Sequence, residues 1–269
     1  MYNLLKGKKG IIFGALDEKS IAWITALKCS EEGAQIVLSN APVAMRMGEI
    51  NKLAEKINAP VIACDVSNGE DVENLIIKTM EHFGGGFDFI LHSIGMSLNV
   101  RKGKHYTEID YAHNLKTFEI SSMSLHRVLA ACMRHDALNE WGSVVALTYI
   151  AAQRVFPDYN EMADAKSLLE SVARSFGYHY GVKKHVRINT VSQSPTRTTA
   201  GSGVKGFDGF ISYAEKMSPL GNASAEDCGN YCVTLFSDLT RMVTMQNLFH
   251  DGGFSNTGVT SEVIEQMGK

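Results

Sequence analysis

Short apolar runs alternate with longer helical patterns along almost the whole chain. Each run is nearly continuous in hydrophobic residues, which is typical of a strand that is covered on both faces. Strands separated by helices pair in parallel through right-handed crossovers, so the pattern predicts an α/β fold: one doubly wound parallel sheet of about seven strands with helices on both faces. The expected strands are 10–14, 34–40, 60–66, 87–95, 142–150, 186–193 and 245–253, and the expected helices are 20–31, 44–57, 69–83, 112–134, 159–180 and 224–237.

The composition excludes several classes of protein. The chain has 269 residues, of which 45% are hydrophobic and 20% are charged, as expected for a single globular domain spanning residues 1–269. No apolar run approaches the ~18 residues of a membrane span, and the N-terminus has no secretory signal pattern. A net charge of −3 favours no nucleic-acid partner. The five scattered cysteines predict reduced thiols and no metal site, so we expect a cytoplasmic protein.

One segment interrupts the alternation. Residues 194–210 are rich in glycine, lack a strong period and follow the sixth expected strand. Loops of this length are uncommon inside compact domains and often serve as lids or binding loops. Because ligands of open parallel sheets bind beyond the carboxyl ends of the strands, we expect a mobile substrate lid at about 196–215. A plain surface loop is the alternative interpretation.

The turn after the first expected strand has the features of a phosphate site. Gly14 would let the backbone approach a phosphate closely, and Ser20 is a natural N-cap for the helix that follows. The N-terminus of that helix would favour an anion. The G-x-G-x-x-G pattern is absent, however, and a purely structural turn explains this segment equally well.

Later strand ends support the same site. Asp65 could accept a hydrogen bond from an adenine amino group, or it could cap the next helix. Ile94 and Gly95 follow the fourth strand, where the backbone would pass close to a ribose or nicotinamide. Together these strand ends predict a Rossmann-type dinucleotide site. The second strand is not followed by the acidic residue that usually holds the NAD ribose, and Arg46 could face a 2′-phosphate, so NADPH is not excluded.

A tyrosine and a lysine stand seven residues apart after the fifth expected strand. Tyr159 and Lys166 would share one face of a helix that begins shortly after Pro157, because 3.6 residues make a turn. On this geometry the ammonium would lower the pKa of the phenol, and it could also hold ribose hydroxyls. Tyr149 precedes this pair by ten residues.

This Tyr-Tyr-Lys set resembles that of the enoyl-[acyl-carrier-protein] reductases, a divergent branch of the short-chain dehydrogenase/reductase family. Ordinary members of that larger family use Y-x3-K with a serine thirteen residues before the tyrosine, whereas Ala163 and Ala146 occupy those positions here. The resemblance extends to the last expected strand. It rests on G-x5-S-I-A (14–22), C-D-V (64–66), H-S-I-G (92–95), L-T-Y-x9-Y-x6-K (147–166), R-I-N-T-V-S-x-S-P-x-R-T (187–198), S-D-L (237–239) and D-G-G-F-S (251–255).

The resemblance implies an enzyme that reduces the trans-2 double bond of enoyl-acyl carrier protein thioesters, the final step of fatty-acid elongation. NADH is the implied cofactor, acyl carrier protein the implied partner, and a homotetramer the implied assembly. Tyr159 would bind the thioester carbonyl and stabilise the enolate, Lys166 would bind cofactor ribose, and Tyr149 would line the acyl pocket. Ser97 would contact substrate. The implied cofactor residues are Gly14, Ser20, Ile21, Asp65, Val66, Ile94, Gly95, Lys166, Thr196 and Thr198.

Two segments depart from the family pattern. Residues 192–196 replace small and apolar residues before the arginine, which could change the packing of the lid, and residues 39–43 differ at the end of the second strand. A basic loop is a candidate docking site for the acidic carrier protein through Arg101, Lys102 and Lys104, with a solvated loop as the alternative.

Two other functions stay open. A related reductase could act on a carbonyl or 3-oxoacyl group with the same fold and cofactor, although Ala146 and the Tyr–Lys spacing disfavour it. A non-catalytic dinucleotide-binding regulator would need neither Tyr159 nor Lys166. His92 and His250 are interpreted as structural histidines.

Overall fold

The computed structural model describes residues 2–46, 49–199, 201 and 206–268. Among them, seven strands form one parallel sheet in the order β3-β2-β1-β4-β5-β6-β7, which confirms the predicted doubly wound α/β fold. The order reverses between β1 and β4, which is where ligands bind in open parallel sheets. The strands are β1 (Lys9–Phe13), β2 (Gln35–Asn40), β3 (Val61–Ala63), β4 (Phe87–His92), β5 (Leu138–Thr148), β6 (Arg187–Gln193) and β7 (Asn247–His250).

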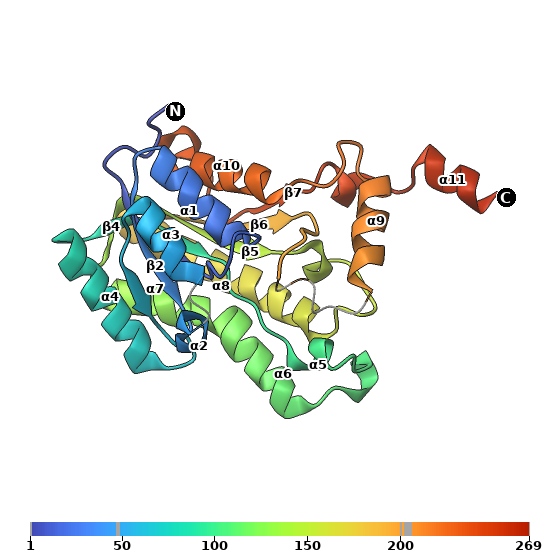
Figure 1. Cartoon of the computed structure of the whole chain (residues 1–269), viewed down its shortest axis with the longest axis horizontal. Helices are drawn as coiled ribbons and strands as arrows, with labels where there is room; N and C mark the ends of the chain where they lie inside the picture. Colours follow the sequence, from blue (N-terminus) through green and yellow to red (C-terminus); the bar gives the residue numbers. More distant parts are fainter. Residues whose placement is uncertain (1, 47–48, 200, 202–205, 269) are drawn as a thin grey trace.

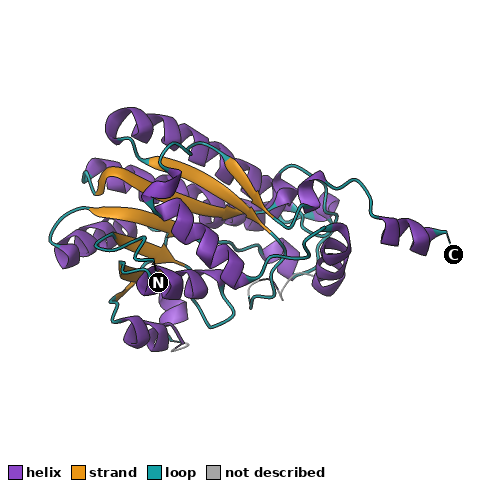
Figure 2. Ribbon diagram, turned by 90° about the horizontal axis from the view of Figure 1, so that it is seen from above, coloured by secondary structure: helices purple, strands orange, loops and turns teal. Residues whose placement is uncertain are grey.

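Helices cover both faces of the sheet (Figures 1 and 2). Ile11 and Phe13 of β1 pack into the core beneath α4, α7 and α8, whereas Ile12 between them packs into the core beneath α1, α3 and α10. Successive side chains of a strand point to opposite faces, so both faces need apolar residues and the run is continuous. The helices are α1 (Ile21–Glu31), α2 (Pro42–Met45), α3 (Glu49–Ile57), α4 (Gly69–Phe83), α5 (Leu98–Arg101), α6 (Tyr111–Phe118), α7 (Ser124–Arg134), α8 (Glu161–Lys184), α9 (Phe207–Met217), α10 (Ala225–Phe236) and α11 (Ser261–Met267).

Several element bounds differ from the sequence prediction. The helix expected at 112–134 is divided into α6 and α7 by a π-helical turn at Glu119–Met123. The helix expected at 44–57 forms α2 and α3, with residues 47–48 outside the described part. Residues 207–215, the second half of the expected lid at about 196–215, lie in α9 (Phe207–Met217). In the described part of the chain, no helix has both the length and the hydropathy needed to cross a membrane.

The start of α8 corrects one premise of the sequence analysis. Tyr159 precedes the helix, because Asn160 has φ 45° and ψ −140° and α8 begins at Glu161. Seven-residue helical spacing therefore does not explain how Tyr159 and Lys166 come together. A positive φ is strained for a non-glycine residue, and such positions cluster at functional sites.

Candidate active site

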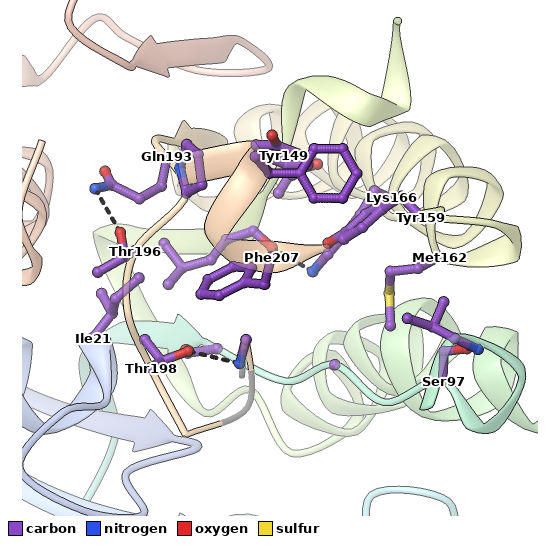
Figure 3. Close-up of a pocket in the computed structure, with 18 of the residues that line it drawn as sticks. Ile21, Ser97, Tyr149, Tyr159, Met162, Lys166, Gln193, Thr196, Thr198 and Phe207 are labelled. Carbon is purple, nitrogen blue, oxygen red and sulfur yellow. Dashed lines mark hydrogen bonds between the residues drawn. The ribbon is translucent and has the colours of Figure 1, made fainter. Parts of the chain in front are cut away.

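A cavity of about 250 Å³ lies beyond the carboxyl ends of β4, β5 and β6. We call it the strand-end cavity. Figure 3 shows Tyr149, Tyr159 and Lys166 on one side of it and Ile21, Gln193 and Thr196 on the other. The predicted site residues that line it are Ile21, Ile94, Gly95, Ser97, Tyr149, Tyr159, Lys166, Thr196 and Thr198.

The two tyrosines form the aromatic wall of this cavity. The rings of Tyr149 and Tyr159 meet edge to face, with 5.2 Å between their centroids. The ring of Phe156 also packs against Tyr149, tilted, with 5.2 Å between the centroids. Edge-to-face contacts of this kind are favourable beyond the area that they bury, so they hold the two phenols in fixed positions at the cavity.

The tyrosines are neutral hydrogen-bond donors. Removal from water raises the pKa of Tyr159 well above its ordinary value, and it raises the pKa of Tyr149 in the same way, with a smaller contribution from the neighbouring Tyr159. The expectation that Lys166 lowers the pKa of Tyr159 is therefore wrong, because burial removes the phenol from water and desolvation penalises the charged tyrosinate. Both phenols keep their protons near neutral pH.

The side chain of Lys166 is held in place by β5. Its Nζ donates to the carbonyl oxygen of Leu147 at 2.8 Å, and its side chain is buried. Burial lowers the pKa of Lys166 to about 8, while the carboxylate of Glu170 one turn later acts in the opposite direction. At neutral pH the amine of Lys166 is therefore protonated, and the side chain lines the cavity.

Glu170 is a supporting residue that the sequence analysis missed. Its Oε1 accepts hydrogen bonds from Thr148 Oγ1 at 3.0 Å and from Asn247 Nδ2 at 3.2 Å, and its Oε2 accepts one from Gln153 Nε2 at 3.3 Å. It thereby ties α8 to β5 and β7 beside Lys166. The signal in the sequence was an acidic residue four positions after the lysine, which places both on one helix face.

The π-helical turn between α6 and α7 was also missed, and it fixes the opposite wall. Ser121 Oγ accepts a hydrogen bond from the Met96 amide at 3.0 Å and donates to the Met96 carbonyl at 3.1 Å. Ser122 Oγ donates to the carbonyl of Ala165, the residue before Lys166, at 2.5 Å. Such turns often occur at functional sites. Here one turn forms hydrogen bonds to two segments that line the cavity, the loop after β4 and the start of α8.

The remaining predicted substrate residue has a different environment from the one expected. Ser97 lines the cavity, but its Oγ donates to Glu161 Oε1 at 2.5 Å and accepts from the Val100 amide at 3.0 Å. Its hydroxyl is therefore already bonded within the protein. Glu161 is buried, and Thr117 Oγ1 also donates to its Oε1, at 3.1 Å.

Four predicted cofactor residues lie outside the lining of the strand-end cavity, at the turns after β1 and β3. Gly14 has φ 92°, and a Cβ built there would stand 2.0 Å from the carbonyl oxygen of Ser93, so only glycine allows the ends of β1 and β4 to meet. Ser20 is the N-cap of α1, and its Oγ accepts from the Trp23 amide at 3.2 Å, as predicted. Val66 is buried behind the second turn.

Asp65 does not cap α4, because the N-cap is Asn68. Its Oδ1 accepts hydrogen bonds from the amide and hydroxyl of Ser67, at 2.9 and 2.7 Å. The hydroxyl and then the amide of Ser67 lower the pKa of Asp65, and Lys116 adds to this. The carboxylate is therefore ionised at neutral pH and able to accept a hydrogen bond from an amino group.

Of the two histidines interpreted as structural, His92 and His250, neither lines the strand-end cavity. His92 is fully buried, with Nε2 2.8 Å from Ser124 Oγ, and burial followed by the charge of Lys166 lowers its pKa to about 3. His250 stacks on Tyr231, and its Nδ1 is 2.6 Å from Gln193 Oε1. Among the described residues, no group of three or more His, Cys, Asp or Glu side chains could hold a metal ion.

The segment at 192–196, which departs from the family pattern, is bonded to the loop before α10 and to β7. Gln193 Nε2 donates to the carbonyl of Ala223 at 3.1 Å, and its Oε1 pairs with His250. Thr196 Oγ1 donates to the carbonyl of Ser194 at 2.9 Å, and Thr198 Oγ1 accepts from the Gly201 amide at 3.0 Å. These bonds place two threonine hydroxyls at the edge of the cavity.

The arrangement fits a dinucleotide on structural grounds. The turn after β1 presents the N-terminus of an 11-residue helix, which favours phosphate. One buried ammonium and two threonine hydroxyls line the cavity beyond β5 and β6. Gly95 lines the cavity without a side chain and is exposed, so a ligand can approach the backbone there.

Comparisons with known proteins place these features in a family. Residues 14–255 match the family described as enoyl-(acyl carrier protein) reductase. The chain is 32% identical over 262 residues to enoyl-[acyl-carrier-protein] reductase [NADH] 2 of Rhizobium meliloti, covering 96% of both chains. The crystal structure of a FabI–NADH complex from Alistipes finegoldii is 64% identical, with a TM-score of 0.95, and covers 96% of this chain and 92% of that one. A Bacillus cereus enoyl-acyl carrier protein reductase solved with NADP+ is 28% identical, with a TM-score of 0.89, covering 95% and 99%.

Proposed function

The chain belongs to the enoyl-(acyl carrier protein) reductase family, and from this premise we propose how its own residues perform the reaction. The enzyme reduces the trans-2 double bond of enoyl thioesters on an acyl carrier protein with NADH, the final step of the fatty-acid elongation cycle. The assignment of roles rests on one observation: Tyr149, Tyr159 and Lys166 line a single cavity at the strand ends.

Tyr159 is proposed to bind the carbonyl oxygen of the substrate thioester. NADH supplies a hydride to C3 of the enoyl group when it is bound. Negative charge then develops on the thioester oxygen, where a preorganised hydroxyl donor commonly stabilises the transition state by ~3 kcal/mol. Protonation of the enolate at C2 from water completes the saturated acyl chain. The raised pKa of Tyr159 keeps this donor protonated. Tyr149 orients the ring of Tyr159 and borders the acyl group near its carbonyl.

Lys166 is proposed to hold the ribose next to the nicotinamide through its ammonium. Thr196 and Thr198 would contact the nicotinamide amide or the diphosphate, and Ile21, Ile94 and Gly95 would border the cofactor. At the turns after β1 and β3, Gly14, Ser20, Asp65 and Val66 would contact the diphosphate and adenosine. At the end of β2, the side-chain amide of Asn40 donates to the Ala15 carbonyl and accepts from the Ala41 amide. Arg46, the residue considered for a 2′-phosphate, is exposed.

A spectrophotometric assay tests this function directly. With crotonyl thioester, the protein should oxidise NADH much faster than NADPH, measured by the loss of absorbance of the reduced nicotinamide. With acetoacetyl thioester the rate should be near background. Faster reduction of the acetoacetyl compound would favour the 3-oxoacyl reductase alternative, and no oxidation with any enoyl thioester would favour the non-catalytic regulator.

We further propose that residues 196–215 form the substrate lid. Of this segment, residues 200 and 202–205 lie outside the described part of the chain. Phe207 and Phe210 of α9 line the cavity, and Thr199 Oγ1 donates to Asp17 Oδ2 at 2.5 Å, beside the turn after β1. Closure of such a segment would exclude water from the reacting atoms.

The basic loop at 101–104 is proposed as a docking site for the carrier protein. Arg101 lines the cavity, and Lys102 and Lys104 are exposed beside it. The carbonyl oxygen of Lys104 accepts a hydrogen bond from Asn160 Nδ2 at 2.5 Å, so the loop is fastened to the residue after Tyr159. An acidic carrier would thus bring its thioester to the cavity by charge attraction.

The double variant Lys102→Glu/Lys104→Glu should raise KM for a carrier-linked enoyl substrate about tenfold at low salt, because reversed rim charges slow association. The KM for crotonyl-pantetheine, which has no carrier, should change by less than about twofold. Lys78→Glu, an exposed charge reversal on α4, is the matched control and should affect neither. Equal changes in KM for both substrates would contradict the proposal.

The assembly and the location of the enzyme are proposals of the same kind. We propose a homotetramer, supported by the family and by exposed apolar side chains at Leu239, Met242 and the edge-strand residue Phe249. Large exposed apolar side chains often mark protein–protein contacts. We propose a cytoplasmic location from the five buried, unpaired cysteines, which are typical of a reducing compartment.

A further inference from the structure

We propose that the buried carboxylate of Glu161 fixes the hydroxyl of Ser97 as a hydrogen-bond acceptor, and that this hydroxyl binds an amide N–H in the pantetheine arm of the carrier-linked substrate. Ser97 then contacts the substrate, and Glu161 is a positioning residue that acts through it. The inference rests on the function proposed above. It assigns a role to a buried acidic group that the hydride transfer does not use, and it names the part of the substrate that this group recognises.

Glu161 occupies a position in which a carboxylate is costly. It is the first residue of α8, and its side chain is fully buried. Its hydrogen-bond partners among the described residues are the hydroxyls of Ser97 and Thr117, both at Oε1, whereas Oε2 has none. A buried charge is normally paired with an opposite charge. Here the N-terminus of a 24-residue helix favours a negative charge, and in the part of the chain that the structure describes no basic side chain bonds to the carboxylate.

The hydrogen bonds of Ser97 determine what its hydroxyl can offer to a ligand. A serine hydroxyl has one hydrogen and two lone pairs. The hydrogen is donated to Glu161 Oε1 at 2.5 Å, and one lone pair accepts the amide of Val100 at 3.0 Å, because Ser97 is the N-cap of α5. One lone pair remains, and Ser97 lines the strand-end cavity. The hydroxyl can therefore accept a hydrogen bond from a ligand but cannot donate one while Glu161 holds its hydrogen.

The substrate offers a donor to such an acceptor only in its pantetheine arm. The acyl chain has no polar hydrogen, and the thioester has acceptors alone. The first N–H lies in the amide that two methylenes separate from the sulfur. A hydroxyl that donates to a carboxylate is polarised by that charge and becomes a stronger acceptor. An acceptor fixed in this way favours an amide over an ester of the same shape, because the ester oxygen would face its lone pair.

The position of Ser97 agrees with the path that this arm would take. Ser97 precedes α5, which leads into the basic loop proposed to dock the carrier. Val100 of α5 and Met162 of α8 belong to one apolar cluster, against which Tyr159 packs. Figure 3 shows Ser97 near Met162, on the same side of the cavity as Tyr159. An arm that runs from the loop at 101–104 to a thioester at Tyr159 would therefore pass Ser97.

Two crotonyl thioesters of nearly equal shape test the proposal. One is the thioester of N-acetylcysteamine, which carries the amide N–H, and the other is that of 2-mercaptoethyl acetate, in which an ester oxygen replaces the N–H. Wild type should have a kcat/KM at least about tenfold higher for the amide compound, as expected when a hydrogen bond to a polarised acceptor is lost. Ser97→Ala should reduce this ratio to about twofold or less, because the acceptor is removed. Initial rates of NADH oxidation measure both values.

Variants of Glu161 separate positioning from a purely structural role. Glu161→Leu frees the hydrogen of Ser97, so the hydroxyl can donate to the ester oxygen, and the ratio should also fall to about twofold or less. Glu161→Gln keeps an oxygen that accepts from Ser97, and it should retain at least about half of the wild-type ratio. Thr117→Val is the matched control, because it removes the other hydroxyl at Glu161 from a residue that does not line the cavity, and it should keep the wild-type ratio.

An unchanged ratio in Ser97→Ala would overturn the proposal, and so would a wild-type ratio near one. Equal losses for both thioesters in Glu161→Leu, together with a lower melting temperature, would also overturn it, because Glu161 would then be only structural. If Glu161→Leu does not fold, the ratio in Ser97→Ala and its retention in Glu161→Gln decide. Failure of wild type to reduce either crotonyl thioester would instead contradict the proposed function, so the two failures are distinguishable.

Discussion

Replacing Tyr159 with phenylalanine should lower kcat for crotonyl thioester about 10²- to 10³-fold, which is the range observed when one preorganised donor to an oxyanion is removed. The ring of phenylalanine preserves the edge-to-face contact with Tyr149, so the aromatic wall should stay in place. Only the hydroxyl is lost, and with it the hydrogen bond that becomes strongest as charge develops on the thioester oxygen. Initial-rate kinetics at saturating NADH measure the change.

Tyr149→Phe is the matched control for this experiment. It removes a hydroxyl from the adjacent ring in the same cavity, and we expect a loss of kcat of about tenfold or less, because Tyr149 is proposed to orient rather than to donate to the developing charge. The Kd for NADH should stay within about twofold of wild type in both variants. If Tyr149→Phe lost more activity than Tyr159→Phe, the proposed roles of the two tyrosines would be exchanged.

Lys166→Met should weaken the binding of NADH by roughly 10²-fold, because hydrogen bonds that involve a charged group contribute about 1.5–3 kcal/mol each. Methionine has a similar length and suits a buried site. Burial lowers the pKa of Lys166, which means that the ammonium is costly to bury, so its removal should not lower the melting temperature by more than a few degrees. Titration of NADH fluorescence together with thermal unfolding separates loss of binding from loss of fold.

Because Lys166 is proposed to bind the cofactor, we expect the affinity for NADH to depend on pH through the titration of this lysine. Its pKa is about 8, so the ammonium is present below that pH and is lost as the pH rises through it. The groups around it do not titrate there: the pKa of His92 is about 3, and the pKa values of Tyr149 and Tyr159 are raised well above their ordinary value. Glu170 has a pKa raised by burial from that of an ordinary carboxyl and opposes the loss of the proton on Lys166.

The affinity of the wild-type enzyme for NADH should therefore fall between about pH 7 and pH 9, and this step should be absent in Lys166→Met. Glu170→Gln should move the wild-type step to lower pH, because it removes the negative charge that favours the ammonium. A step at the same pH in Lys166→Met would assign the titration to another group.

Some of the site could be predicted from the sequence because it depends on local patterns. Ile11, Ile12 and Phe13 are apolar in succession, and only a strand buried on both faces satisfies such a run. Parallel strands bring their carboxyl ends to one edge of the sheet, so residues after β4, β5 and β6 had to be neighbours. The cavity accordingly contains Ile94, Tyr149 and Thr196.

Other parts could not be predicted, because they depend on contacts between distant segments. The sequence placed Tyr159 on a helix, whereas the positive φ of Asn160 starts α8 two residues after it. The sequence also suggested a lowered pKa for that tyrosine from its neighbouring ammonium, and only the extent of its desolvation in the folded chain reversed the direction.

By itself, the sequence determined the succession of strands and helices along the chain and the edge of the sheet that holds the site, since these follow from hydrophobic periodicity and crossover geometry. Individual residues of the site, such as Ile21, Thr196 and Thr198, came from the resemblance to a family. Only the tertiary structure decided how the site is supported. The hydrogen bond between Glu170 and Asn247 and the hydrogen bond between Ser121 and Met96 each join segments that are far apart in the chain. Such contacts depend on the packing of whole elements, which no local pattern of residues specifies.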